Sequence, residues 1–289
     1  MADYAKLIAQ AERLLERLEA LVPAAAPETD WPAAIAWRWR RNAGAGRLQP
    51  VLHPHRIALD DLQGIAQQKQ RVERNTRQFV QGLPANNVLL TGARGTGKSS
   101  LVKALLNRYA ARRLRLIEVG KHDLMDLPDI VERVAGRPER FIVFCDDLSF
   151  AAEEPGYQAL KAVLDGSVAA PSDNVLVYAT SNRRHLMPEY MAENLEATRV
   201  GEEIHPGEAV EEKISLSERF GLWVSFHPFG QEDYLGIVAY WLGRLGAEAS
   251  PDVERAALQW ALTRGSRSGR VAWQFARDWA GRHGMKARP

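Results

Sequence analysis

Five short apolar runs alternate with helical patterns between residues 86 and 227. Nearly every position in each run is apolar: Val88–Thr91, Leu114–Val119, Phe141–Cys145, Val175–Ala179 and Leu222–Phe226. Strands of this kind are buried on both faces, as in a parallel sheet that helices cover. The stretches between the runs include three with helical spacing: 98–111, 127–135 and 157–164. This alternation predicts a doubly wound α/β fold, an αβα sandwich around a five-stranded parallel sheet.

The chain is predicted to be helical on either side of this region. After Pro228 there is no strand pattern, and three segments have helical spacing: 231–245, 251–264 and 268–281. Residues 3–22 form one amphipathic helical pattern, and a proline- and alanine-rich linker at 22–27 follows it. We therefore expect a helical N-terminal extension with a linker, an αβα core and a small all-helical C-terminal domain: 1–56, 57–229 and 230–289.

Composition and charge exclude several classes of protein. The net charge of +2 gives no overall basic field that would argue for nucleic acid. Cys145 is the single cysteine and cannot form an internal disulfide, which favours a reducing compartment. The sequence has no long uncharged apolar run and no signal-peptide pattern at its start. We therefore expect a cytoplasmic protein with no membrane span.

A phosphate-loop pattern follows the first apolar run. Residues 92–99 read GARGTGKS and match G-x-x-x-x-G-K-[ST], with a helical pattern directly after them. Glycines let successive N–H groups point at phosphate oxygens, and a helix beginning near Lys98 adds the positive end of its dipole. Lys98 is expected to reach the β- and γ-phosphates of ATP, and the Ser99 hydroxyl to bind Mg²⁺. The candidate phosphate-binding residues are Gly92, Ala93, Arg94, Gly95, Thr96, Gly97, Lys98, Ser99 and Ser100.

Two acids follow the apolar run Phe141–Cys145. A strand that ends in acids places their carboxylates at the carboxyl edge of the sheet, where ligands bind in open α/β folds. Asp146 is expected to hold Mg²⁺ through water, and Asp147 to polarise the water that attacks the phosphate. The alternative is a pair of acids that only opens a loop.

These motifs resemble the AAA+ P-loop ATPases, and among them the bacterial ATP-binding family catalogued as domain of unknown function 815. The resemblance covers about Trp37 to Phe275 and rests on five strings in order: NNVLLTGARGTGKSSLVKALL, FIVFCDDLSF, YATSNRRHL, EEKISLSERFGLWVSF and RGSRSGR. It implies a five-stranded αβα core with a helical lid, ATP and Mg²⁺ as cofactors, and hydrolysis of ATP to ADP and phosphate.

The resemblance also implies roles for single residues. Asn182 resembles the polar sensor that positions the water beside Asp147, although it could instead cap a strand end. Arg219 resembles the arginine finger that one subunit inserts into the site of its neighbour. Its alternative is a surface ion pair with Glu218 or another acid.

Two further segments match the family in position. Either Arg267 or Arg270 is similar to the second sensor, which reaches the phosphates from the lid. The segment 59–65 is similar to the one that contacts adenine in this superfamily, through three residues: Leu62, Gly64 and Ile65.

The chain also departs from the family pattern. Most AAA+ enzymes have Asp-Glu at the second acidic element, where this chain has Asp146-Asp147. Ala151 stands where the family commonly has Glu, with Glu153 and Glu154 nearby. These departures leave nucleotide binding intact and the hydrolysis rate open.

A compact aromatic and basic cluster lies upstream, formed by Trp31, Trp37 and Trp39 with Arg38, Arg40 and Arg41. Such clusters can stack on single-stranded bases. We favour a structural role, with arginines lying over buried tryptophans or with an edge that docks on the core.

The sequence therefore favours an oligomeric AAA+ ATPase, such as a hexameric ring, that couples Mg-ATP hydrolysis to remodelling of an unidentified protein or nucleic-acid partner. A slowly hydrolysing nucleotide switch or loader acting on DNA is the first alternative. A small-molecule kinase with the same phosphate loop is the second.

Overall fold

The computed structural model describes residues 29–42, 45–150, 155–165, 172–182, 198–200, 203–205 and 216–285, with Tyr4, Ile8, Glu12 and Arg13. Apart from those four helical positions, the predicted N-terminal helix 3–22 lies outside the described residues, as do the linker at 22–27 and Ala151, Glu153 and Glu154. Within the described ranges, no helix has both the length and the apolar character needed to cross a bilayer.

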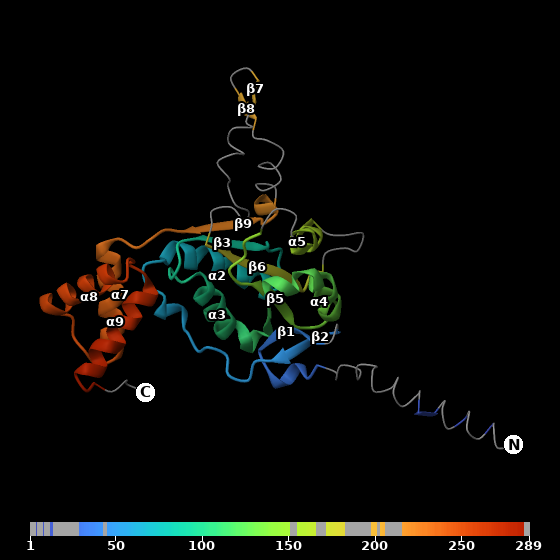
Figure 1. Cartoon of the computed structure of the whole chain (residues 1–289), viewed down its shortest axis with the longest axis horizontal. Helices are drawn as coiled ribbons and strands as arrows, with labels where there is room; N and C mark the ends of the chain where they lie inside the picture. The colour runs from blue at the N-terminus through green and yellow to red at the C-terminus, as the bar shows by residue number, and fades with distance from the viewer. Residues whose placement is uncertain are drawn as a thin grey trace.

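A seven-stranded sheet forms the centre of the molecule (Figure 1). Its order is β2 (Ala45–Pro50), β1 (Ala36–Asn42), β4 (Leu114–Val119), β5 (Arg140–Cys145), β6 (Val175–Ser181), β3 (Val88–Gly92) and β9 (Leu222–Phe226). All neighbours are parallel except the antiparallel pair of β1 and β2. The five predicted apolar runs are β3, β4, β5, β6 and β9. The α/β class is therefore confirmed, while the expected number of five strands is two too low.

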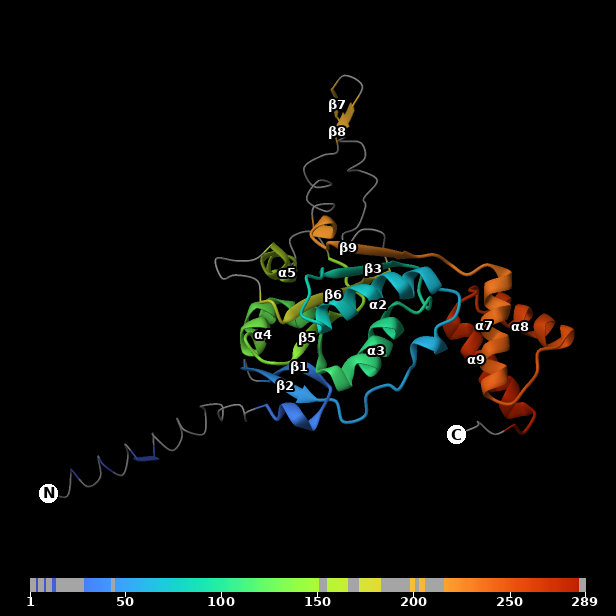
Figure 2. The same cartoon turned by 180° about the vertical axis from the view of Figure 1, so that it is seen from behind.

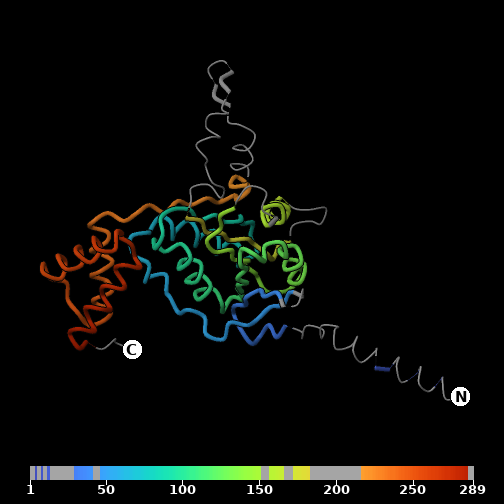
Figure 3. Tube along the Cα trace, in the orientation of Figure 1, coloured from blue at the N-terminus to red at the C-terminus, as the bar shows by residue number. Residues whose placement is uncertain are grey.

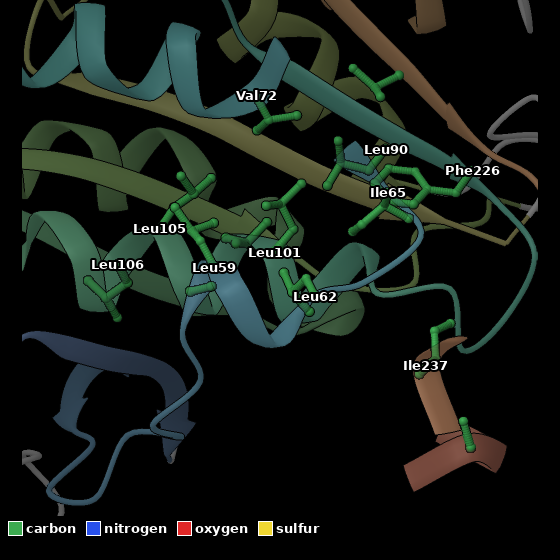
Figure 4. Close-up of a cluster of buried hydrophobic side chains, with 14 of the residues drawn as sticks. Leu59, Leu62, Ile65, Val72, Leu90, Leu101, Leu105, Leu106, Phe226 and Ile237 are labelled. Carbon is green, nitrogen blue, oxygen red and sulfur yellow. The ribbon is translucent and has the colours of Figure 1, made fainter. Parts of the chain in front are cut away.

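Alternate side chains of the central strands enter two separate cores, because successive residues of a strand point to opposite faces. Leu90 packs in one core with Val72 and Leu101 (Figure 4), and Leu89 packs in the other with Leu160. Helices cover both faces of the sheet (Figure 2). They are α2 (Ala66–Val80) and α3 (Lys98–Tyr109) on one face, and α4 (Leu127–Val134) and α5 (Pro155–Asp165) on the other.

Short elements complete the α/β part. Four 3-10 helices occur among the described residues: η1 (Trp31–Ala33), η2 (Leu59–Asp61), η3 (Ala110–Arg112) and η4 (Lys121–Asp126). A second, antiparallel sheet pairs β7 (Thr198–Val200) with β8 (Glu203–His205). The outer edge of β9 is capped by α2, because Gln68 and Arg71 donate side-chain hydrogen bonds to the Ser225 and Trp223 carbonyls at 3.2 Å each.

The aromatic and basic cluster forms η1 and strand β1, so this part of the predicted N-terminal extension belongs to the central sheet. Trp37 and Trp39 are each only 1% exposed. The Trp39 indole Nε1 donates to Asp126 Oδ2 at 2.8 Å, and Arg41 Nη2 donates to Asp126 Oδ1 at 2.7 Å. The Arg133 guanidinium lies 5.0 Å from the Trp39 ring centre. This packing agrees with the structural role that we favoured for the cluster.

Three helices follow β9 and form a bundle at the opposite end of the molecule from β1 and β2 (Figures 1 and 3). They are α7 (Gln231–Arg244), α8 (Pro251–Thr263) and α9 (Gly269–Arg282), close to the predicted segments. Ser250 and Ser268 cap α8 and α9, each accepting a bond from the backbone N–H three residues later. Tyr240 of α7 joins this bundle to the core, because its hydroxyl donates to Asp61 Oδ1 at 2.7 Å.

Replacing Asp126 with alanine should destabilise the protein by about 2 kcal/mol, because the buried Trp39 N–H would lose its acceptor. Urea unfolding measures the change. Asp129→Ala is the matched control, because Asp129 is exposed one helical turn further on. Equal stability of the two variants would contradict this account of β1.

Candidate functional site

The loop between β3 and α3 requires glycine where the backbone takes positive φ angles. Gly92 has a φ of 124°, and a Cβ at this position would lie 1.9 Å from the Phe226 carbonyl oxygen. Gly95 and Gly97 have φ angles of 74° and 100°. Because α3 begins at Lys98, its first N–H groups and the positive end of its dipole lie at the loop. Ser100 follows in the first turn, so the loop and this turn form a site suited to an anion.

The ammonium of Lys98 lies inside this loop. It donates to the Gly92 carbonyl at 2.7 Å, to the Ala93 carbonyl at 2.8 Å and to Asn182 Oδ1 at 3.1 Å. Burial lowers the pKa of Lys98, although the nearby carboxylates of Asp147 and Asp146 act to raise it. A buried cation surrounded mainly by neutral acceptors is poised to bind the oxygens of an incoming phosphate.

Asp146 lies beside the first turn of α3. Its Oδ1 accepts from Ser99 Oγ and from Thr180 Oγ1, both at 2.6 Å. The hydroxyl and the carboxylate that the sequence predicts as Mg²⁺ ligands are therefore in direct contact. Magnesium prefers oxygen ligands and takes only one or two carboxylates, with water and phosphate oxygens completing its shell. Ser99 and Asp146 are therefore the candidate ligands, and the described residues contain no cluster of three or more His, Cys, Asp or Glu that could hold a metal.

Asp147 turns its carboxylate toward Asn182. The backbone of Asp147 is left-handed, with a φ of 55°, and its N–H donates to Thr180 Oγ1 at 2.8 Å. The Asn182 Nδ2 donates to the Asp147 carboxylate. Because Asn182 also accepts from Lys98, one continuous set of hydrogen bonds joins the phosphate loop to Asp147.

The helical bundle touches the phosphate loop directly. The Gly269 N–H, at the start of α9, donates to the Gly95 carbonyl at 2.9 Å. A Cβ on Gly95 would lie 2.8 Å from Ser268 Oγ and 3.5 Å from Arg270 Cβ. Arg267 lines a cavity of about 810 Å³ between the loop and the bundle. The structure therefore brings both predicted lid arginines to the loop.

Residues of both the phosphate loop and the helical bundle line this cavity. The loop supplies Ala93, Arg94 and Thr96, and the bundle supplies residues of α8 and of the turn before α9. Phe229, in the connection between β9 and α7, also lines it. Its volume is within the range of roughly 300–1,000 Å³ that is usual for pockets that bind small molecules and cofactors.

The predicted adenine segment supports the loop from behind. A Cβ on Gly97 would lie 3.4 Å from Ile65 Cδ1 and 3.8 Å from Leu62 Cδ2. A Cβ on Gly64 would lie 2.9 Å from Phe229 Cε1, so the Phe229 ring covers this glycine. Contact of these residues with adenine stays a prediction.

Arg219 lies near the amino-terminal ends of the parallel strands, whereas the phosphate loop lies at their carboxyl-terminal ends. This arginine lies three residues before β9, whose first residue pairs with Val88 at the start of β3, whereas the phosphate loop follows the end of β3. Its Nε binds Asp165 Oδ1 at 2.5 Å. The ion pair considered from the sequence is therefore present, with Asp165 rather than Glu218 as the acid.

Comparison with known proteins places the chain in a family. A family model described as "Protein of unknown function (DUF815)" matches residues 32–283. The chain belongs to the DUF815 family. A comparison with curated proteins gives no match.

Solved structures show the fold of this DUF815 member. One is a point mutant of RuvB from Thermotoga maritima, with a TM-score of 0.52 and 13% identity over 76% of this chain. Another is ORC1 from Aeropyrum pernix in complex with DNA, with a TM-score of 0.54 and 18% identity over 79% of this chain. The AAA domain of FIGL-1 in complex with ADP has a TM-score of 0.51 and 17% identity over 78%. The fold is therefore that of the AAA+ proteins.

These matches cover different shares of the other proteins. The chain spans 63% of the RuvB chain, 63% of the ORC1 chain and 73% of the FIGL-1 chain.

Thr180 is a site residue that the sequence prediction missed. Its hydroxyl donates to Asp146 and accepts from the Asp147 N–H, so it fixes both acids of this DUF815 member. Its signal in the sequence is the change from apolar to polar residues at the end of the run Val175–Ala179. A hydroxyl there lies beside the acids because β5 and β6 are parallel neighbours.

Replacing Thr180 with valine should weaken Mg-dependent ATP binding about tenfold, because hydrogen bonds to charged groups are the stronger kind. Calorimetric titration with ATP, in Mg²⁺ and in EDTA, measures the effect. Thr180→Ser keeps the hydroxyl and should bind like the wild type. Equal affinities of the valine and serine variants would show that Thr180 does not order the acids.

Proposed function

We propose that this protein is a Mg-dependent ATPase whose own residues bind the triphosphate and orient the attacking water. The observation that carries the proposal is the connected set of Lys98, Asn182 and Asp147 beside the pair of Ser99 and Asp146. The loop N–H groups and Lys98 would bind the β- and γ-phosphates, and Ser99 and Asp146 would hold Mg²⁺. When bound, Mg²⁺ supplies positive charge that offsets the charge on the β- and γ-phosphate oxygens.

Asp147 is suited to orient the attacking water. Its carboxylate can accept a hydrogen bond from the water while Asn182 holds the carboxylate in place. The water oxygen then bonds to the γ-phosphorus, the bond to the β-phosphate oxygen breaks, and ADP and phosphate leave. Because aspartate is one methylene shorter than the usual glutamate, we expect a low turnover rate.

Lid residues would complete the site. Gly269 binds the loop at Gly95, and this contact would hold Arg267 and Arg270 near the bound phosphates. Arg267 and Thr96 both line the cavity of about 810 Å³, whereas the predicted adenine contacts Leu62, Gly64 and Ile65 do not.

Oligomerisation is supported by the place of Arg219. This residue lies at the opposite edge of the sheet from the loop of its own chain, so it is unsuited to stabilise its own γ-phosphate. A guanidinium is suited to bind charge that develops on phosphoryl oxygens. We infer that Arg219 serves the site of a neighbouring subunit, in an oligomer such as a hexameric ring that remodels a macromolecular partner.

A slowly hydrolysing switch that acts on DNA is the second candidate. It is favoured by Asp147 in place of glutamate and by the likeness to ORC1, which was solved in complex with DNA. Slow hydrolysis is expected of both candidates, so the discriminating result is ATP-dependent, salt-sensitive binding of DNA, which would favour this candidate over protein remodelling.

Replacing Lys98 with alanine should raise the Kd for ATP at least about a hundredfold, because the phosphates lose their buried charge-assisted partner. Fluorescence or calorimetric titration measures the affinity, with circular dichroism to show that the variant folds. Lys103→Ala, further along the same helix α3, is the control and should bind ATP normally. Micromolar affinity retained in the Lys98 variant would refute the proposed site.

Mixing Arg219→Ala subunits with Asp147→Asn subunits should restore part of the ATPase activity. Each variant alone should be slow, while a mixed interface pairs an intact Arg219 with an intact Asp147 site. Steady-state ATPase assays across mixing ratios measure the recovery, and native mass spectrometry verifies the mixed oligomer. A verified mixed oligomer without recovery would rule out action in trans.

A further inference from the structure

The guanidinium of Arg219 is held by an acid from another element. Asp165 is the last residue of α5, and its Oδ1 lies 2.5 Å from Arg219 Nε. The two side chains are 42% and 22% exposed, respectively. The pair therefore lies at the protein surface, where an incoming neighbour can meet it.

The backbone on both sides of Arg219 is anchored in the core. Leu216 is fully buried and Phe220 is 3% exposed, and both belong to the cluster that contains Tyr157 and Leu160 of α5. Arg219 and Asp165 therefore start from two elements that pack on each other. This packing fixes the distance between the two chain segments and leaves only side-chain rotations to be set.

The position of Asp165 is unfavourable for an acid on local grounds alone. The carboxyl end of a helix carries partial negative charge, and acids are disfavoured there. The contact with Arg219 supplies the positive partner that this carboxylate lacks within its own last turn, which contains no basic residue. The acid at this position is thus accounted for by Arg219.

We propose that Asp165 is a positioning residue for Arg219, an inference that rests on the proposed role of Arg219 in a neighbouring site. A guanidinium is planar, with its N–H groups in a fixed fork. A carboxylate bound at Nε therefore sets the plane and direction of the whole group. Partly exposed pairs of this kind are weak, so Asp165 orients Arg219 and still allows it to bind phosphate.

The test compares the ATPase kinetics of four variants of the full-length protein: Asp165→Ala, Asp165→Glu, Arg219→Ala and the Asp165→Ala/Arg219→Ala double variant. Asp165→Ala should lower kcat about tenfold, the size expected for a misplaced group, with unchanged ATP affinity and oligomeric state. Asp165→Glu keeps the charge and should recover most of the rate. The double variant should be no slower than Arg219→Ala, because Asp165 acts only through Arg219.

Asp252→Ala is the matched control. It removes an exposed aspartate that pairs with Arg255 on α8, and its kcat should equal that of the wild type. Asp165→Asn, which keeps the shape of the side chain, gives the same test if the alanine variant does not fold. A slow asparagine variant supports the proposal, and a wild-type rate in that variant overturns it.

The outcomes separate this inference from the proposed function. If Arg219→Ala hydrolyses ATP slowly but Asp165→Ala has the wild-type rate, only the positioning role of Asp165 is overturned. Additive losses in the double variant would overturn it as well, because Asp165 would then act elsewhere. A wild-type rate for Arg219→Ala would instead overturn the arginine finger itself, and the positioning role with it. In mixtures with Asp147→Asn subunits, Asp165→Ala subunits should regain activity, because the partner then supplies an intact Arg219 and Asp165.

Discussion

Strand β3 pairs with β6 on one side and with β9 on the other, and these two pairings place the phosphate loop among the other parts of the site. The end of β3 runs into the phosphate loop, and Gly92 lies against Phe226 at the end of β9. On the other side, β6 brings Thr180 and Asn182 to the same edge, and β5 next to it brings the two acids. The carboxyl ends of parallel strands share one edge. Asn182 therefore meets Lys98, although the two are 84 positions apart in the sequence.

The part of the fold that could be predicted is the part where burial is unambiguous. Strands covered on both faces are apolar at most positions, so β3 to β6 and β9 stand out in the sequence. The phosphate loop stands out because its backbone takes positive φ angles at Gly92, Gly95 and Gly97, which favour glycine and leave a glycine pattern in the sequence. Such local constraints can be recognised in the sequence without knowledge of the tertiary structure.

Other parts could not be predicted because their local signal points elsewhere. In β1, Trp37 and Trp39 alternate with arginines, and this short pattern favours a structural role without showing that the segment joins the central sheet. Helix α2 is mostly polar, and two of its four buried residues are Asn75 and Thr76. Both bind the buried Tyr178 hydroxyl, at 3.2 and 2.8 Å, so this face of the helix is completed by hydrogen bonds rather than by apolar residues.

The candidate site also has parts that the sequence predicts and parts that it does not. The identities of Lys98, Asp146 and Asn182 follow from motifs, whereas the hydrogen bonds that join them depend on the neighbour order of the strands. The contact of Gly269 with Gly95 is a backbone hydrogen bond, so the types of the side chains do not predict it. The pair of Arg219 and Asp165 joins residues 54 positions apart, and no spacing rule reports it.

Strand β9 lies between Arg219 and the phosphate loop. Arg219 precedes its first residue, and Phe226 at its end accepts a bond from the Ala93 N–H at 3.2 Å. Five extended residues span roughly 17 Å, so one short strand separates the loop that would bind a subunit's own nucleotide from the arginine proposed to serve its neighbour. This strand is hydrogen-bonded along its length to β3, and α2 caps two of its outer carbonyls. The phosphate loop and the segment that carries Arg219 are therefore held at the two ends of the same short strand.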